Sequence, residues 1–192
     1  MVRPPPPACP GSTNEVNGGE RQTARLIGRP PRPEDRAAYH AHFTREPIER
    51  WLRPPPLPPF DAKLIDRLLA EDVEHWQRHG FGPWVLIERG SGSFAGRGGL
   101  AWTSVEDELA VELPWTIEPA LQGRGLATEA ARAAVEHAYE LGLRELIALT
   151  LPSNLASQRV AEKAGLHRDG ECEHAGLAHL LFRLRLKRRT GF

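Results

Sequence analysis

Residues 122–128 read Gln-Gly-Arg-Gly-Leu-Ala-Thr and stand between a β-rich run and an amphipathic helical pattern. The two glycines allow a tight turn in which backbone N–H groups converge, and a helix start adds partial positive charge. The segment is therefore suited to hold a phosphate or pyrophosphate, with Arg124 as an added charge. The simpler alternative is a helix start that merely contains glycine, because short glycine patterns are weak evidence alone.

Two other phosphate-binding motifs do not fit this segment. A Walker loop requires Gly-Lys followed by Ser or Thr, and the sequence has no such tripeptide. A dinucleotide-binding fingerprint needs a third glycine where Thr128 stands and an acid at the end of the next strand. Glu145 precedes that strand, so the geometry of that fingerprint is not met.

Outward from this segment, strands and helices are expected along the whole chain. The helix after residue 125 places Leu126, Ala130, Ala134, Ala138 and Leu141 on one face, and an earlier helix at 61–80 places Leu64, Leu68, Leu69, Val73 and Trp76 on another. Periodicity and turn signals also predict a strand at 23–29, a helix at 31–43, an irregular proline-rich connection at 47–60, β-rich runs at 83–89, 94–103 and 108–118, an apolar run at 146–151, a helical segment at 154–166, and terminal strands near 166–173 and 177–186.

Two prolines stand where a central strand should tolerate none. Pro114 interrupts the run 108–118 and Pro152 follows the run 146–151, and each removes a backbone donor. Either these strands are edges, or they part at the prolines. Parting strands would expose unpaired backbone groups that an extended, amide-bearing ligand can pair with.

Composition excludes several classes of partner. The 192 residues are 40% hydrophobic, and Lys plus Arg and Asp plus Glu number 25 each, which gives no charge footprint for nucleic acid or an anionic membrane. The two cysteines, Cys9 and Cys172, form no metal knuckle, and a Pro-rich leader at 1–22, expected to be disordered, lacks an apolar signal segment. The cysteines and the lack of such a segment favour a cytoplasmic protein. No metal is expected, because Trp76 stands where a zinc-protease motif would need Glu after His75.

Two segments resemble a known family. The stretch QGRGLATEA at 122–130 is similar to the acetyl-CoA loop of the GNAT N-acetyltransferases, whose pattern is Arg/Gln-x-x-Gly-x-Gly/Ala. The stretch NLASQRVAEKAGL at 154–166 resembles the Asn-x-x-Ser-x-x-Val-x-x-Lys-x-Gly-Phe segment of its RimJ/RimL-type branch. The resemblance covers about residues 23–186 and leaves the leader and a C-terminal tail at 187–192 outside.

This resemblance implies an α/β (α+β) GNAT fold, with a mixed, mostly antiparallel central sheet splayed between its fourth and fifth strands and flanked by helices. It implies acetyl-CoA as co-substrate. Backbone groups of Trp115, Thr116 and Ile117 would pair with pantetheine, and Asn154 and Ser157 would lie beside the thioester. The amides that would hold the pyrophosphate belong to Gln122, Gly123, Arg124, Gly125, Leu126, Ala127 and Thr128.

The implied reaction transfers acetyl to a primary amine by direct attack on the thioester. Glu112 is the candidate base that accepts the amine proton, directly or through water. The alternative is that Glu112 is a strand carboxylate with a structural role only. Glu108 and Glu118 are the next candidates for the base. Ser157 is the candidate donor to the leaving sulfur, against a hydroxyl that bonds its own helix. Many members carry a tyrosine acid where this chain has Ala161, so the general acid stays open.

The acceptor is expected to be a peptide α-amine first and a small-molecule amine second, with a non-catalytic CoA-binding regulatory module as the competing class. A homodimer is compatible with either. The N-terminal helices carry a mixed set of charges that suits a zwitterionic or peptidic partner better than a polycation. This set is Arg36, Arg45, Glu46, Glu49, Arg50 and Arg53.

Overall fold

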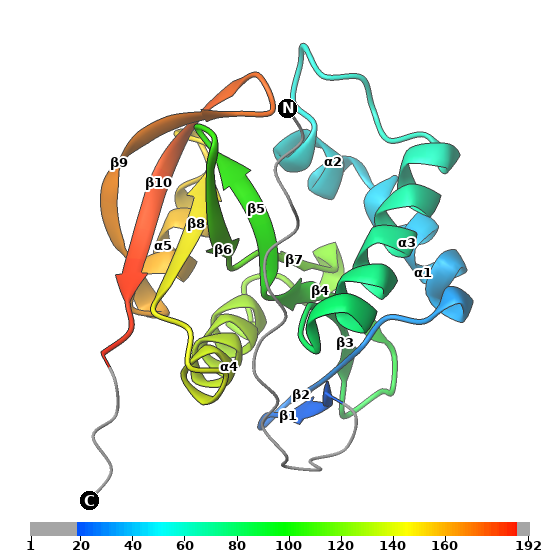
Figure 1. Cartoon of the computed structure of the whole chain (residues 1–192). Helices are drawn as coiled ribbons and strands as arrows, with labels where there is room; N and C mark the ends of the chain where they lie inside the picture. Colours follow the sequence, from blue (N-terminus) through cyan, green and yellow to red (C-terminus); the bar gives the residue numbers. More distant parts are fainter. Residues whose placement is uncertain (1–18, 188–192) are drawn as a thin grey trace, which may run out of the picture.

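The computed structural model describes residues 19–187, which form two five-stranded sheets with helices packed around them (Figure 1). The first sheet has the strand order β1-β2-β3-β4-β7 and the second β5-β6-β8-β10-β9. The strands are β1 (Arg21–Gln22), β2 (Leu26–Arg29), β3 (Pro83–Glu88), β4 (Phe94–Gly99), β5 (Ala101–Val105), β6 (Glu108–Glu112), β7 (Trp115–Ile117), β8 (Glu145–Thr150), β9 (His167–His174) and β10 (Leu177–Arg185). The helices are α1 (Arg36–Phe43), α2 (Glu46–Leu52), α3 (Ala62–His79), α4 (Leu126–Glu140) and α5 (Leu155–Lys163), with short 3-10 turns at Pro33–Asp35 and Pro119–Leu121.

Two hydrophobic clusters hold these layers together. The larger one surrounds α4, which packs on β4 and β7 and reaches α5. Ala130, Ala134 and Ala138 are at most 2% exposed, and their small side chains let the helix lie close to the strands. The second cluster joins α1, α2 and α3 to the first sheet through Tyr39, Phe43, Ile48, Ile65, Leu69 and Val85.

The sheet parts at Pro114, as the prolines predicted, but it forms two sheets where one splayed sheet was expected. Glu112 pairs with Ile147 in the parallel β6–β8 ladder, and the Leu113 N–H donates to the Ile147 carbonyl over 2.8 Å. Pro114 has no N–H to continue the ladder, and β7 instead pairs with β4. Gly96 permits this close approach, because a Cβ there would lie 2.0 Å from the Thr116 carbonyl oxygen. The expected mixed, mostly antiparallel arrangement of strands flanked by helices is confirmed.

Three local expectations need correction. The expected irregular connection 47–60 begins with α2, whose first turn contains Pro47, a position where a missing N–H costs nothing. The expected leader 1–22 ends in β1, which pairs with β2; residues 1–18 lie outside the described part. The buried face of α3 is centred on Ile65, Leu69 and Asp72, so the expected stripe is rotated slightly.

Candidate active site

A cavity of about 770 Å³ lies beside β7 and β8, next to the point where the β6–β8 ladder ends. Its wall combines the ends of β6 and β8, the strand β7, the first turns of α4 and α5, and side chains from α2 and α3. The structure brings together at this wall every candidate site residue except Arg124, while their contacts with a cofactor stay predictions. These residues are Glu112, Trp115, Thr116, Ile117, Gln122, Gly123, Gly125, Leu126, Ala127, Thr128, Asn154 and Ser157.

The loop before α4 has the backbone geometry that the glycines predict. Gly123 and Gly125 have φ of 75° and 79°, the left-handed region that glycine adopts without strain. The Gln122 side chain donates to the Ile117 carbonyl over 2.9 Å and ties the loop to β7. The first N–H groups of α4 lack carbonyl partners inside the helix and carry the positive end of its dipole. The loop therefore has the geometry of an anion-binding turn at a helix start.

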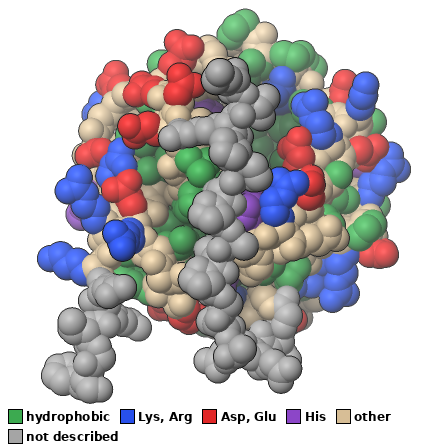
Figure 2. Space-filling model, in the orientation of Figure 1, with side chains coloured by type: hydrophobic (Ala, Val, Ile, Leu, Met, Phe, Trp, Pro, Cys, Tyr) green, Lys and Arg blue, Asp and Glu red, His purple; other side chains and the backbone are tan. Residues whose placement is uncertain are grey.

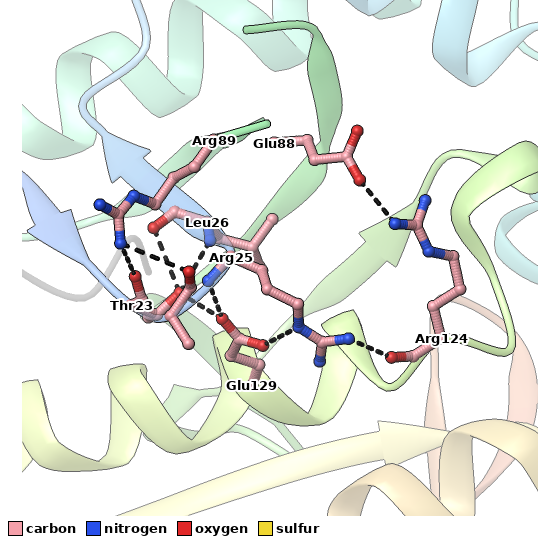
Figure 3. Close-up of polar contacts among 8 residues, drawn as sticks. Thr23, Arg25, Leu26, Glu88, Arg89, Arg124 and Glu129 are labelled. Atoms are coloured by element: carbon pink, nitrogen blue, oxygen red, sulfur yellow. Dashed lines mark hydrogen bonds and ion pairs between the residues drawn. The ribbon is translucent and has the colours of Figure 1, made fainter. Parts of the chain in front are cut away.

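Arg124, the added charge that the sequence suggests for this loop, does not line the cavity and is paired outside it. Its guanidinium lies 2.9 Å from the Glu88 carboxylate, and its carbonyl accepts from the Arg25 side chain over 2.7 Å (Figure 3). Arg25 in turn donates to Glu129 over 2.7 Å, where Thr23 also donates. The N-terminal segment thus clamps the loop from outside the cavity. These partners are distant in sequence, so no local pattern reveals them.

The cavity faces a free backbone edge of β7 and a buried hydroxyl on β8. Within residues 19–187, β7 is the outermost strand of the first sheet, paired with β4 on one side alone. Thr150 is 3% exposed, and its Oγ1 has no hydrogen-bond partner among the described residues. Buried polar atoms in folded proteins are nearly always bonded, so an unpartnered one at a cavity wall fits a polar, amide-bearing arm.

Asn154 and Ser157 meet at the start of α5. The Asn154 side-chain oxygen accepts from the Ser157 backbone N–H over 3.1 Å, which caps the helix. This bond commits the Oδ1 acceptor and leaves the amide nitrogen of Asn154 for a ligand. Both residues line the cavity.

Glu112, the candidate base, lines the cavity. Burial raises the pKa of Glu112 above its ordinary value, opposed by the charges of His174 and Arg97. Among the three glutamates considered, it alone lines the cavity: Glu108 is exposed, and Glu118 bonds His42 over 2.5 Å and Arg45 over 3.2 Å. A raised pKa of the carboxyl group lies closer to the pKa of the amine whose proton it would accept.

Two polar groups in or beside this site, Arg97 and His42, escape sequence reasoning. Arg97 on β4 lines the cavity and makes two bonds of 2.6 Å with Asp72, which also accepts from the Tyr39 hydroxyl over 2.9 Å. His42 on α1 is fully buried, and burial lowers its pKa. Both depend on pairings between distant segments, and a single Arg or His in sequence gives no signal of them.

His75, weighed in the sequence as the start of a zinc motif, is held by backbone contacts. The His75 Nδ1 lies 2.7 Å from the Phe81 carbonyl, and its Nε2 accepts from the Trp102 N–H over 2.9 Å. Both ring nitrogens of His75 are therefore engaged.

Residues 19–187 contain no group of three or more His, Cys, Asp or Glu side chains suited to a metal ion. In the same part of the chain, no helix has the length and apolar character to cross a membrane.

Comparison with known proteins matches residues 25–167 to the family model described as "Acetyltransferase (GNAT) domain". Of curated relatives, YkkB of Bacillus subtilis is 30% identical over 110 residues, which are 54% of this chain and 64% of YkkB. YnaD of the same organism, described as an uncharacterized N-acetyltransferase, is 39% identical over 64 residues, which are 33% of this chain and 38% of YnaD. These matches span less than two thirds of the relatives' lengths.

Solved structures agree over nearly the whole described chain. An acetyltransferase from Agrobacterium tumefaciens has a TM-score of 0.75 and 26% identity, covering 92% of this chain and all (100%) of that one. The ribosomal-protein-S5-alanine acetyltransferase of Vibrio fischeri (TM-score 0.68, 16% identity, 86% and 96% covered) shares the fold. The aminoglycoside acetyltransferase AAC(6')-Ib bound to ribostamycin and coenzyme A shares the fold as well. Its TM-score is 0.69 and its identity 18%, and the match covers 86% of this chain and 97% of that chain.

Proposed function

The chain belongs to the GNAT acetyltransferase family, and on this premise we propose that it is an acetyl-CoA-dependent N-acetyltransferase acting on a primary amine. One observation carries the proposal. A single cavity joins the loop at the start of α4, the free edge of β7 and the carboxyl of Glu112. A group-transfer site needs these three parts together: an anion cradle, a groove for an extended arm and a proton acceptor.

We assign the cofactor contacts as follows. Backbone N–H groups from Gly123 to Thr128 hold the pyrophosphate, and the open edge of β7 pairs with the pantetheine amides. Thr150 and the amide nitrogen of Asn154 are available as further donors in the same wall. Acetyl-CoA, when bound, supplies the thioester acetyl group.

The proton lost by the amine goes to Glu112, directly or through one water. A neutral α-amine costs about 1 kcal/mol to prepare at neutral pH, whereas a lysine-like amine costs about 4 to 5 kcal/mol. A single half-buried carboxylate is therefore an adequate base for an α-amine. Ala161, at the position of a tyrosine acid in many members, is fully buried and offers no proton, so we assign the donor role toward the departing sulfur to Ser157.

We place a peptide α-amine, as in the RimJ/RimL-type branch, ahead of a small-molecule amine. The cavity wall holds two carboxylates, Glu71 and Glu112, which is few for a polycation such as an aminoglycoside. Of the six charges expected to face the acceptor, Arg53 alone lines the cavity. The others are held elsewhere: Arg36 by Asp66, Arg45 by Glu118, Glu46 by Arg50, and Glu49 by the Phe60 N–H.

The experiment that tests this function has two steps. Calorimetry with acetyl-CoA measures binding, and free CoA release with a library of peptide and small-molecule amines measures turnover. Binding with turnover supports the proposal. Binding without turnover on any amine would favour the non-catalytic CoA-binding module, and no binding at millimolar acetyl-CoA would contradict both.

A further inference from the structure

The α2 and α3 side of the cavity is built from large apolar side chains. They come from α2, from the proline-rich segment 53–61 and from the start of α3. On the face seen in Figure 2, hydrophobic side chains are visible in a hollow beside the α2 region, with charged side chains around it. The apolar lining on this side includes Trp51, Leu52, Leu57, Phe60, Leu64 and Leu68.

This apolar wall is fixed by its own polar contacts. The Arg53 Nε donates to the Pro58 carbonyl over 2.5 Å, and its guanidinium lies 5.5 Å from the centre of the Phe60 ring. The Phe60 N–H donates to the Glu49 carboxylate over 2.6 Å, which ties the segment back to α2. A wall held in this way is preorganised, so a ligand loses little free energy in ordering it.

The charges on this side leave little for a cationic ligand. Glu71, the carboxylate of this part of the wall, lies 3.6 Å from Arg67 one turn earlier on α3. Arg53 adds a positive charge. The carboxylate that remains for an amine is Glu112, at the place where the sheets part. A fitting ligand therefore has one amine toward Glu112 and an uncharged, apolar part toward Trp51.

From this arrangement we infer that the acceptor is an amine whose neighbouring substituent is a large aliphatic or aromatic group, such as a peptide that begins with Phe or Leu. The inference rests on the proposed function, since it places the amine at Glu112. Burial of such a side chain strengthens the binding affinity by roughly tenfold to hundredfold. The same factor is expected in kcat/KM between apolar and polar acceptors.

The test uses the full chain with saturating acetyl-CoA and four amino-acid amides that share an α-amine: phenylalaninamide, leucinamide, serinamide and glycinamide. The Phe and Leu amides should have a kcat/KM about tenfold or more above the other two. Trp51→Ala should reduce the ratio of kcat/KM between the apolar and polar amides, mainly through KM. Leu57→Ser, a second variant at a residue outside the helices, should do the same. Leu109→Ala is the matched control, because Leu109 is 45% exposed and does not line the cavity.

The outcomes separate this inference from the function on which it rests. Turnover of all four amides with similar kcat/KM, unchanged by Trp51→Ala, would overturn the inference and leave the acetyltransferase proposal standing. Absence of turnover with every amine would contradict the proposed function. Saturation-transfer NMR with phenylalaninamide and serinamide then decides the inference by itself: stronger binding of the Phe amide, lost in Trp51→Ala, supports it, and equal binding overturns it.

Discussion

The His42 Nε2 lies 2.8 Å from the Thr116 hydroxyl, although 74 residues separate them in sequence. The other ring nitrogen of His42 lies 2.5 Å from Glu118. Helix α1 is thereby bonded to the two residues that flank Ile117 on β7, the strand proposed to hold the cofactor arm. The fully buried His42 side chain therefore links α1 to the proposed cofactor side of the cavity.

Replacing Glu112 with Gln should lower kcat by about a hundredfold to ten-thousandfold, the usual contribution of a general base. Acetyl-CoA affinity should stay within about twofold in calorimetry, because the proton acceptor acts mainly in the transition state. Glu108→Gln is the control, an exposed carboxylate on the same strand.

The pH profile provides an independent reading of Glu112. Burial raises its pKa, and the base must be ionised, so kcat should fall as the pH drops through that raised pKa. In Glu112→Gln this acidic limb should vanish. An intact limb, or an unchanged kcat, would remove Glu112 from the mechanism.

Gly123→Ala should weaken acetyl-CoA binding by roughly tenfold or more. The left-handed φ of 75° strains any residue with a Cβ, by about 1 kcal/mol, and the loop would shift its converging N–H groups. Gly142→Ala is a close match: its φ is 69°, a Cβ there meets nothing within 4 Å, and it lies outside the cavity wall. Both variants should lose similar stability in urea, while Gly142→Ala alone keeps full affinity. Equal affinity in the two would argue against a phosphate site at the loop.

Arg124→Ala should change acetyl-CoA affinity by less than about threefold, because its guanidinium is paired with Glu88 and half exposed. Calorimetry at low and moderate salt checks this. A loss of tenfold or more would mean that Arg124 leaves Glu88 to meet the phosphates.

His137 makes folding stability depend on pH. Burial, helped by the charge of Arg21, lowers the pKa of His137 to about 4. Above about pH 6.5, His137 is neutral in both states and its contribution is complete. As the pH falls from 6.5 toward 4, the unfolded chain binds the proton first and up to about 3 kcal/mol is lost. Urea titrations at pH 7.5, 5.5 and 4.5 should show this slope, and His137→Gln should flatten it; an unaltered slope in the variant would assign it to other groups.

Local signals in the sequence predicted the parts of this fold that depend on nearby residues. The glycine loop, α3, α4 and the terminal hairpin follow from turn chemistry and periodicity, and Pro114 marks where the sheet parts because a missing donor is a local property. Helix α2 was not predicted, because the proline in its first turn is also typical of a segment without regular structure. The Arg124–Glu88 and Arg97–Asp72 pairs escaped for a different reason, since they form between segments that meet after folding.

The second hydrophobic cluster gives the acceptor side a foundation of its own. Tyr39, Phe43, Ile48, Ile65, Leu69 and Val85 anchor α1, α2 and α3 to the first sheet, apart from the cluster around α4. Ile48 of α2 and Phe60 of the segment 53–61 belong to this second cluster, so we expect substitutions near them to disturb the packing around α4 little. If the proposed function holds, a few substitutions on the α2 side should exchange one acceptor for another while the cofactor side keeps its packing.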